Sequence, residues 1–311
     1  MQNNLAFVFP GQGSQSLAML ADFSDHEVVQ NTFSEASDAL GYDLWQLVQQ
    51  GPVEKLNQTN FTQPALLTAS VAIWRLWQAS SSAKPTILAG HSLGEYSALV
   101  CAGVFSLADA VKLVEKRGEF MQASVPAGTG AMYAIIGLAD DKIIEACAQA
   151  AQGEVVSAVN FNSPGQVVIA GNKAAVERAG ELCKEAGAKR ALPLPVSVPS
   201  HCALMKDAAD KLAEEFNNIT FNTPNISVVN NVDVAIESSA QAIKTALIKQ
   251  LYSPVRWTET IQYLAQNGVE QVIEAGPGKV LQGLLKRIDK TISCQSVNDS
   301  TSLTKALESV E

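Results

Sequence analysis

The sequence is poor in the residues that build disulfide frameworks and metal centres. Only five of its 311 residues are cysteine and only three are histidine. The cysteines are odd in number and far apart, and none belongs to a Cys-x-x-Cys pair, so we expect reduced thiols. The histidines lack the spacing of metal ligands, and we predict neither a metal nor a cofactor; they are His26, His91 and His201.

Positive charge and long apolar runs are also scarce. The formal net charge is −9 at pH 7, which argues against a nucleic-acid partner and against binding to a membrane surface. No apolar run reaches the ~18 residues that a membrane-spanning helix needs. The segment Met1–Asn4 lacks the positive charge that begins a signal peptide. We therefore expect a cytoplasmic protein without membrane association.

Apolar residues are abundant and follow alternating helix and strand patterns. Hydrophobic residues make up 47% of the chain and charged residues 17%, enough for a sizeable core. At roughly 100–200 residues per domain, the length suggests about two domains. Strand and helix patterns alternate from end to end, which predicts an α/β fold.

The order of predicted strands and helices changes in the middle of the chain. The breaker-rich segment Val125–Gly130 precedes a β-α-β-β-α-β pattern, with strands at 131–136, 155–161, 166–170 and 189–196 and helices at 140–151 and 172–186. We expect residues 128–198 to form a ferredoxin-like domain. It interrupts a large α/β-hydrolase-like domain made of residues 1–127 and 199–311. The crevice between the two is the expected substrate site.

The large domain should contain further elements on both sides of the insert. Its predicted strands are 5–9, 86–89, 226–230, 270–274 and 291–297. Its predicted helices are 27–40, 64–78, 93–101, 107–124, 203–217, 239–251, 256–267 and 279–288, and Ser106 is the expected N-cap of the helix at 107.

The pentapeptide Gly90–Gly94 (Gly-His-Ser-Leu-Gly) joins a strand to a helix and places Ser92 at the apex of the turn. The flanking glycines allow close strand–helix packing and a strained backbone, which is typical of a serine nucleophile. The backbone N–H of Leu93 should point to where an oxyanion forms. The alternative is a glycine-rich turn with an incidental serine.

His201 is the expected base for this serine, by elimination. His91 is adjacent to Ser92, and its side chain should point to the opposite face, while His26 lies in a polar surface segment. His201 follows Pro199 in a stiff loop at the predicted domain junction. The sequence does not choose an acid to orient the imidazole; the candidates are Asp109, Asp140, Asp141 and Glu154.

Two further features bear on the site. The loop Gly11–Gln15 fails the dinucleotide fingerprint because Ser16 stands at its last position, so it is either a plain turn or a source of a backbone N–H for an oxyanion. Arg117 lies on the apolar stripe of its helix. A buried arginine needs a partner, either a carboxylate of this chain or the carboxylate of a substrate bound in bidentate fashion.

In this order along the chain, the motifs resemble those of the malonyl-CoA:acyl-carrier-protein transacylase family of bacterial type II fatty-acid synthesis. They are Gly11–Gln15, Gly90–Tyr96, Arg117, Asn160–Gly165 and Pro199–His201. The resemblance covers essentially the whole length. It implies transfer of a malonyl group from malonyl-CoA to the phosphopantetheine thiol of acyl carrier protein, through a malonyl-serine ester. The inserted ferredoxin-like domain is also a property of this family.

The resemblance implies a role for each matching residue. Ser92 is similar to the acyl-accepting nucleophile and His201 to its base, and the amides of Gln12 and Leu93 resemble an oxyanion hole. Arg117 resembles the clamp on the malonyl carboxylate, and Gln63 a residue near it. In this family a main-chain carbonyl orients the histidine, and Gln250 matches that position, so no acid is needed.

The carrier protein is acidic, so its docking face on this acidic chain should be locally basic. The best clusters are Lys189 with Arg190 and Lys286 with Arg287, although each could equally be a solvated charged face. We expect a monomer. Three other functions remain open: a serine esterase or thioesterase, a transferase for another acyl group such as methylmalonyl or acetyl, and a non-catalytic scaffold that binds acyl carrier protein.

Overall fold

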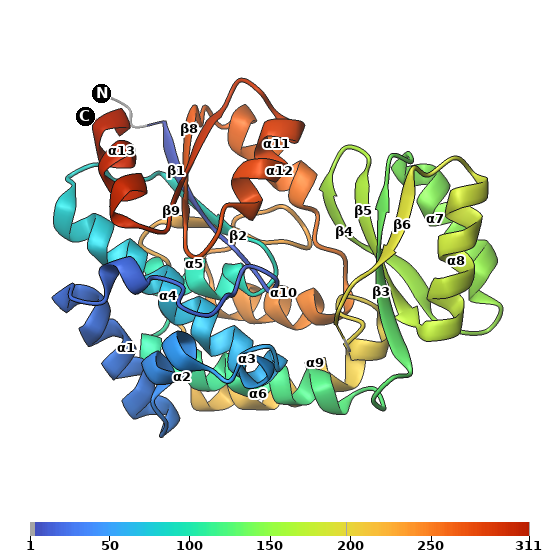
Figure 1. Ribbon diagram of the computed structural model, residues 1–311, viewed down its shortest axis with the longest axis horizontal. Coiled ribbons are helices and arrows are strands. Elements are labelled where there is room, and N and C mark those ends of the chain that lie inside the picture. Colours follow the sequence, from blue (N-terminus) through green and yellow to red (C-terminus); the bar gives the residue numbers. More distant parts are fainter. Residues whose placement is uncertain (1–3, 197, 311) are drawn as a thin grey trace.

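The computed structural model describes residues 4–196 and 198–310 and contains a five-stranded and a four-stranded sheet (Figure 1). Residues 1–3, on which part of the signal-peptide expectation rests, lie outside the described residues, as do 197 and 311 of the expected domain ranges. Within the described ranges, no helix is both long and apolar enough to cross a membrane. The fold is mixed α/β, as the alternating patterns predict.

The larger sheet is parallel throughout and has the order β7-β2-β1-β8-β9. Its strands are β1 (Leu5–Phe9), β2 (Ile87–Gly90), β7 (Ser227–Val229), β8 (Gln271–Ala275) and β9 (Ser293–Val297). All five residues of the central strand β1 are buried. Such an unbroken apolar strand is typical of a parallel sheet covered by helices on both faces.

Alternate residues of β1 enter two different cores. Phe7 and Phe9 face the larger core and contact Trp74 edge-on, with ring centroids 5.1 and 6.5 Å apart, whereas Ala6 and Val8 face the smaller one. Helices that contribute to the larger core are α1 (Glu27–Leu40), α2 (Leu44–Gln50), α3 (Val53–Leu56), α4 (Thr59–Ser80), α5 (Gly94–Cys101), α6 (Leu107–Ala123), α9 (Lys206–Glu215), α10 (Ala240–Tyr252) and α13 (Ser300–Val310). The smaller core is closed by α11 (Trp257–Gln266) and α12 (Val280–Ile288).

The second sheet is antiparallel, with the order β4-β5-β3-β6, and lies at the right in Figure 1. Its strands are β3 (Gly130–Ile136), β4 (Val156–Ser163), β5 (Gln166–Asn172) and β6 (Arg190–Pro193). Helices α7 (Asp140–Ala151) and α8 (Lys173–Glu185) pack on one face around a separate apolar core. Met132 and Val168 on the other face pack with Cys202 of the larger unit.

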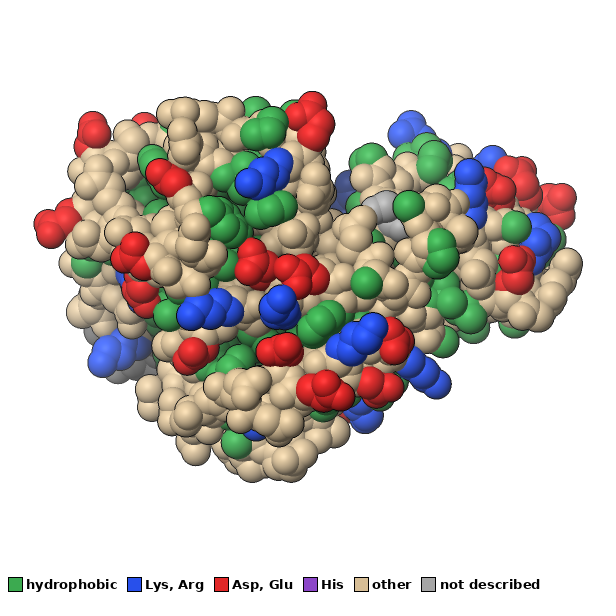
Figure 2. Space-filling model, turned by 90° about the horizontal axis from the view of Figure 1, so that it is seen from below, with side chains coloured by type: hydrophobic (Ala, Val, Ile, Leu, Met, Phe, Trp, Pro, Cys, Tyr) green, Lys and Arg blue, Asp and Glu red, His purple; other side chains and the backbone are tan. Residues whose placement is uncertain are grey.

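A short backbone pairing joins the two units. The Val255 N–H donates to the Val159 carbonyl at 2.8 Å, and the Phe161 N–H donates to the Val255 carbonyl at 3.0 Å. The segment before α11 therefore extends the β4 edge of the small sheet. The space-filling view from below shows a large and a small lobe, with basic and acidic side chains interspersed on the visible face (Figure 2).

Several elements differ from the sequence-based expectations. Helix α4 begins at Thr59, five residues before the expected start, and contains Pro64. Proline usually marks the start of a helix, but here the preceding turn is buried and packing overrides that preference. The expected helix 203–217 is divided into the 3₁₀ turns Ala203–Met205 and Phe216–Asn218 around α9. Helices α2, α3 and α13 were not expected.

Candidate active site

The turn between β2 and α5 presents Ser92 in a strained conformation. Its φ is 53°, in the left-handed region that non-glycine residues rarely adopt. The glycines on either side permit this geometry. A Cβ on Gly90 would lie 1.9 Å from the carbonyl carbon of Gly94, and one on Gly94 would lie 2.0 Å from the carbonyl oxygen of Phe9. Glycine is therefore required at both positions for the strand and helix to approach this closely.

Ser92 and His201 are brought together although they lie 109 residues apart in the sequence. Ser92 Oγ lies 2.7 Å from His201 Nε2, and His201 Nδ1 lies 2.6 Å from the carbonyl oxygen of Gln250 in α10. Because a carbonyl only accepts, Nδ1 carries the proton and Nε2 is free to accept from the serine hydroxyl. Burial, followed by the positive charge of Arg117, lowers the pKa of His201 to about 3. The imidazole is therefore neutral at physiological pH.

The other histidines lie elsewhere. His91 Nε2 lies 2.8 Å from Asn162 Oδ1, and the ring packs edge-on against Trp257, with centroids 5.5 Å apart. His26 is exposed before the first turn of α1. In the part of the chain that the structure describes, none of the candidate acids contacts His201: Asp109, Asp140 and Asp141 lie in the first turns of α6 and α7, and Glu154 pairs with Arg178.

Arg117 projects from α6 towards Ser92 and is only 2% exposed. Its Nη1 donates to Gln63 Oε1 at 2.7 Å, and its Nη2 donates to Gln250 Oε1 at 3.0 Å and to Ser92 Oγ at 3.4 Å. Among residues 4–196 and 198–310, no carboxylate lies within ion-pair distance of the guanidinium, and its Nε–H has no acceptor. The described residues therefore form no internal salt bridge with Arg117, which was one of the two alternatives for this arginine.

The Gln250 side chain links several parts of the site. Its Nε2 donates to the Ser92 carbonyl at 3.0 Å and to Glu95 Oε2 at 2.8 Å, while its Oε1 faces Arg117. Glu95 lies in α5 and is 2% exposed. Burial raises its pKa to about 7, although hydrogen bonds from Gln250 and Asn231 and the charge of Arg117 oppose the shift.

Asn231, in the loop after β7, holds the backbone of the nucleophile turn. Its Oδ1 accepts the Ser92 N–H at 2.7 Å, its Nδ2 donates to the Gly90 carbonyl at 2.7 Å, and its own N–H donates to Glu95 Oε2 at 3.0 Å. Sequence reasoning missed both Glu95 and Asn231. A carboxylate set directly after Gly94 in an otherwise apolar helix is a signal that could have indicated Glu95.

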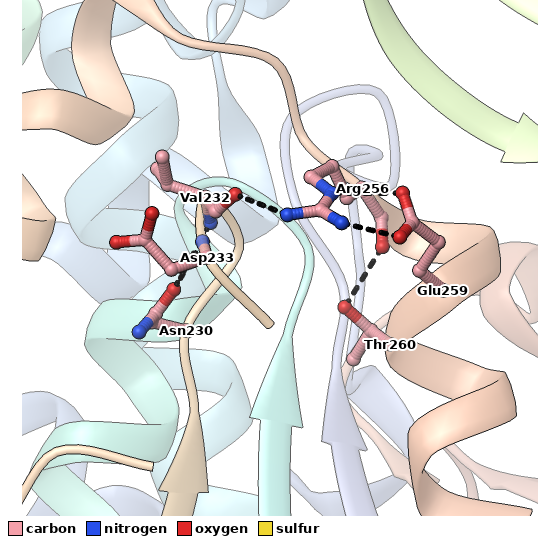
Figure 3. A network of polar contacts seen from close by, with 6 residues as sticks. All are labelled: Asn230, Val232, Asp233, Arg256, Glu259 and Thr260. Atoms are coloured by element: carbon pink, nitrogen blue, oxygen red, sulfur yellow. Dashed lines mark hydrogen bonds and ion pairs between the residues drawn. The ribbon is translucent and has the colours of Figure 1, made fainter. Parts of the chain in front are cut away.

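Polar contacts also fix the loop that carries Asn231 (Figure 3). Asn230 Oδ1 accepts the N–H groups of Val232 and Asp233 at 3.1 and 2.7 Å. Arg256, which is ion-paired with Glu259, donates to the Val232 carbonyl at 3.1 Å. The loop is therefore tied both to itself and to the start of α11.

A cavity of about 470 Å³ opens above Ser92. Both units line it: Gln12, Leu93 and Arg117 belong to the larger one, and Met132 and Asn160 to the smaller one. Within the described ranges, the backbone N–H groups of Gln12 and Leu93 have no hydrogen-bond acceptor. They are thus available to a ligand atom in the cavity. In the same ranges, no three histidine, cysteine or acidic side chains lie close enough together to hold a metal ion.

Comparisons with known proteins identify the family of this chain. Residues 6–305 match the model of the acyl transferase domain family. The chain is 65% identical over 304 residues to the malonyl CoA-acyl carrier protein transacylase of Escherichia coli strain K12, covering 97% of this chain and 98% of that protein. It is 67% identical over 299 residues to the enzyme of the same name from Haemophilus influenzae, covering 96% of each.

Solved structures show the same likeness. The crystal structure of an acyl carrier protein S-malonyltransferase from Vibrio cholerae superimposes with a TM-score of 0.96 at 67% identity, over 98% of this chain and 100% of that one. A malonyl-transacylase solved in complex with the acyl-carrier protein of a type II PKS gives a TM-score of 0.97 at 65% identity, over 98% and 99%. The chain therefore belongs to the malonyl-CoA:acyl-carrier-protein transacylase family of acyl transferases.

Proposed function

We propose that this protein transfers a malonyl group from malonyl-CoA to the phosphopantetheine thiol of acyl carrier protein, through a malonyl-serine ester, in fatty-acid biosynthesis. The observation that carries the proposal is the 2.7 Å contact between Ser92 Oγ and Nε2 of a neutral His201, with the buried Arg117 beside it. Family membership supports the same substrate pair.

The first half-reaction forms the ester. His201 Nε2 takes the hydroxyl proton as Ser92 Oγ attacks the thioester carbonyl, and the Gln250 carbonyl keeps Nδ1 protonated and the ring in place. Collapse of the tetrahedral intermediate breaks the carbon–sulfur bond. The proton on Nε2 passes to the departing sulfur, so CoA leaves as a thiol and His201 is neutral again.

The backbone N–H groups of Gln12 and Leu93 are proposed to bind the oxyanion. Both line the cavity beside Ser92, and neither has an acceptor among the described residues. Loss of one such donor typically costs about 3 kcal/mol of transition-state stabilisation. The two N–H groups lie on the turn after β1 and at the start of α5. Because these positions are fixed, the groups can stabilise the oxyanion without reorganisation.

Arg117 is proposed to bind the malonyl carboxylate. Gln63 and Gln250 fix the guanidinium through neutral amide oxygens, and a ligand carboxylate would replace the long 3.4 Å contact between Nη2 and Ser92 Oγ. A buried cation without a carboxylate partner favours an anionic ligand strongly. This position would hold the thioester carbonyl over Ser92 and favour malonyl over acetyl groups.

In the second half-reaction, the carrier-protein thiol attacks the malonyl-serine ester. His201 takes the thiol proton and returns it to Ser92 Oγ as the ester bond breaks. Water would hydrolyse the same ester. The bound malonyl group fills part of the cavity and, with Arg117 at its far end, excludes water from the carbonyl.

We further propose an α/β-hydrolase-like domain of residues 1–127 and 199–311, with residues 128–198 as an inserted ferredoxin-like domain. The strand order β4-β5-β3-β6 supports the second assignment, because it places the first and third strands of the insert at the centre. We also propose that the enzyme is monomeric and cytoplasmic.

Carrier protein is proposed to dock on the rim formed by Lys189, Arg190, Lys286 and Arg287. All four side chains are exposed. Arg190 and Gln166 both pair with Ile136 from opposite sides, so they lie about 10 Å apart across the sheet. Arg287 Nη1 donates to Gln166 Oε1 at 2.8 Å, which brings α12 to the same end of the sheet. The two clusters therefore form one basic rim for an acidic partner.

The test is intact-mass measurement after mixing with malonyl-CoA, followed by peptide mapping and then addition of phosphopantetheinylated carrier protein. A malonyl adduct on Ser92 that moves to the carrier thiol is expected, and Ser92→Ala should form none. Rapid loss of the adduct to water before carrier protein is added would indicate an esterase. The absence of any adduct on the wild type would indicate a non-catalytic scaffold.

A further inference from the structure

Glu95 is a buried carboxylate that takes no part in the proposed proton transfers. It lies on the first turn of α5, three residues after Ser92, and is 2% exposed. In the described part of the chain it forms no ion pair. A carboxylate removed from water without an ion-pair partner is costly, so its contacts need an explanation.

Both hydrogen bonds to Glu95 end on a single oxygen. Oε2 accepts the Asn231 N–H at 3.0 Å and the Gln250 Nε2–H at 2.8 Å. Because Oε2 accepts in both contacts and the Ser92 carbonyl can only accept, the Gln250 amide turns its NH₂ group towards Glu95 and the Ser92 carbonyl. The amide oxygen of Gln250 then faces Arg117 Nη2, at 3.0 Å.

The second donor keeps this arrangement fixed. The Asn231 N–H comes from a loop held by Asn230 and Arg256, so its position does not adapt easily to a change at residue 95 (Figure 3). Asn231 also holds the Ser92 N–H through Oδ1. Glu95 thus connects the turn that carries the nucleophile with the amide that aligns the guanidinium.

The indirect arrangement leaves Arg117 free to bind substrate. A carboxylate in direct contact with the guanidinium would occupy the N–H groups that a substrate carboxylate needs. Glu95 instead acts through Gln250, and its negative charge still partly balances that of Arg117, as their mutual electrostatic effects indicate.

We propose that Glu95 is a positioning residue for acyl selectivity: by fixing the amide orientation of Gln250, it aligns Arg117 for a carboxylate-bearing acyl group. This inference rests on the proposed function. It predicts that loss of the acceptor at Oε2 lowers reactivity with malonyl-CoA more than reactivity with acetyl-CoA, because the acetyl group has no carboxylate for Arg117 to bind.

Three substitutions of Glu95 separate the effect of the hydrogen-bond acceptor at Oε2 from the effect of the negative charge. Glu95→Gln can place its amide oxygen at the Oε2 position and keep both hydrogen bonds, so its malonyl-to-acetyl rate ratio should stay within about twofold of wild type. Glu95→Met fills similar space without an acceptor, and the ratio should fall roughly 10- to 100-fold. Glu95→Asp keeps the charge but withdraws the oxygen by one methylene, and a smaller fall in the same direction is expected.

The readout is the rate of Ser92 acylation by each acyl-CoA, measured by intact mass, with thermal unfolding to confirm that each variant is folded. If Glu95→Met does not fold, the Glu95→Asp ratio decides the question. In an Arg117→Ala background, Glu95→Met should leave the ratio unchanged, because the group that it aligns is gone.

The outcomes are distinct. Equal losses with both acyl-CoAs, or an undiminished effect of Glu95→Met in the Arg117→Ala background, would overturn this inference while the proposed function stands. A wild-type protein that takes no malonyl group onto Ser92 would overturn the proposed function and this inference with it. A wild-type-like ratio for Glu95→Gln together with a collapsed ratio for Glu95→Met supports the inference.

Discussion

The imidazole Nδ1 of His201 lies 2.6 Å from the main-chain carbonyl oxygen of Gln250. A carbonyl orients the ring and fixes the tautomer as a carboxylate would, but it brings no negative charge to stabilise an imidazolium. Burial disfavours the charged ring, and the positive charge of Arg117 nearby acts in the same direction, so both lower the pKa of His201. The resting imidazole is consequently held neutral far below the pH at which a free histidine would become charged.

We predict that acylation of Ser92 by malonyl-CoA shows no inflection at the usual histidine pKa of 6.5. Because the pKa of His201 is lowered to about 3, the neutral base persists throughout the range above pH 5. The Glu95 pKa of about 7 should not appear either, since a protonated carboxyl still offers Oε2 as an acceptor. The measurement is kcat/KM for malonyl-CoA from pH 5 to 8. A tenfold fall between pH 7 and pH 5.5 would contradict it.

Arg117→Ala should abolish malonyl selectivity. Without the guanidinium, the malonyl carboxylate would enter a cavity with no charge partner, and kcat/KM for malonyl-CoA should fall about 100-fold or more. Acetyl-CoA should react as well as before or better. Arg117→Lys is the matched control, because it keeps the charge but not the paired N–H groups that Gln63 and Gln250 hold. Unchanged malonyl transfer by Arg117→Ala would exclude the assigned role.

Site residues with a characteristic local sequence could be predicted. Ser92 was indicated by two glycines that flank it in a strand-to-helix turn, and Arg117 by its place on an apolar helix stripe. The partner of His201 could not be found from the residues alone, because every residue has a carbonyl. Its place at Gln250 was implied only by the family resemblance.

Glu95 and Asn231 illustrate what local pattern cannot provide. They are 136 residues apart and meet because β7 pairs with β2, which brings the loop after one strand to the turn after the other. The alternating patterns predict both strands but not their adjacency. Likewise, the start of α4 at Thr59 depends on burial of its first turn, which outweighs the local preference of Pro64.

Gly90→Ala should destabilise the protein strongly. The added Cβ would meet the backbone of Gly94 and Glu95 at 1.9–2.3 Å, so α5 would have to move away from the sheet. We expect a loss of about 3 kcal/mol or more in unfolding free energy. The matched control is Gly283→Ala in α12, where the Cβ meets nothing within 4 Å and a gain of about 0.5–1 kcal/mol is expected. Urea unfolding of both variants provides the measurement, and equal stabilities would refute the argument.

Charge reversal on the proposed docking rim should affect the second half-reaction more than the first. In the double variant that combines Arg190→Glu with Arg287→Glu, the KM for carrier protein should rise about tenfold. The acidic partner would lose the positive charges that steer it to this surface. The effect should shrink as salt is raised. The same reversal at Lys211, which pairs with Asp207 on α9, is the control. The docking assignment fails if both reversals raise this KM equally.

Glu95→Gln should flatten the dependence of stability on pH. Glu95 has a pKa of about 7 in the folded state, against about 4.5 in the unfolded chain, because burial outweighs the hydrogen bonds from Gln250 and Asn231 and the attraction of Arg117. Between these values the folded state binds the extra proton, so the contribution of Glu95 is complete below pH 4.5 and is lost as the pH rises through 7.

The loss corresponds to about 3 kcal/mol of unfolding free energy for the wild type between pH 4.5 and pH 8. Glutamine keeps both hydrogen bonds at this position and does not ionise. Relative to wild type, Glu95→Gln should therefore gain stability steadily over this range. Urea unfolding at pH 5 and pH 8 measures the difference directly. A stability gap between the two proteins that stays constant with pH would show that residue 95 ionises in the folded state as readily as in the unfolded chain.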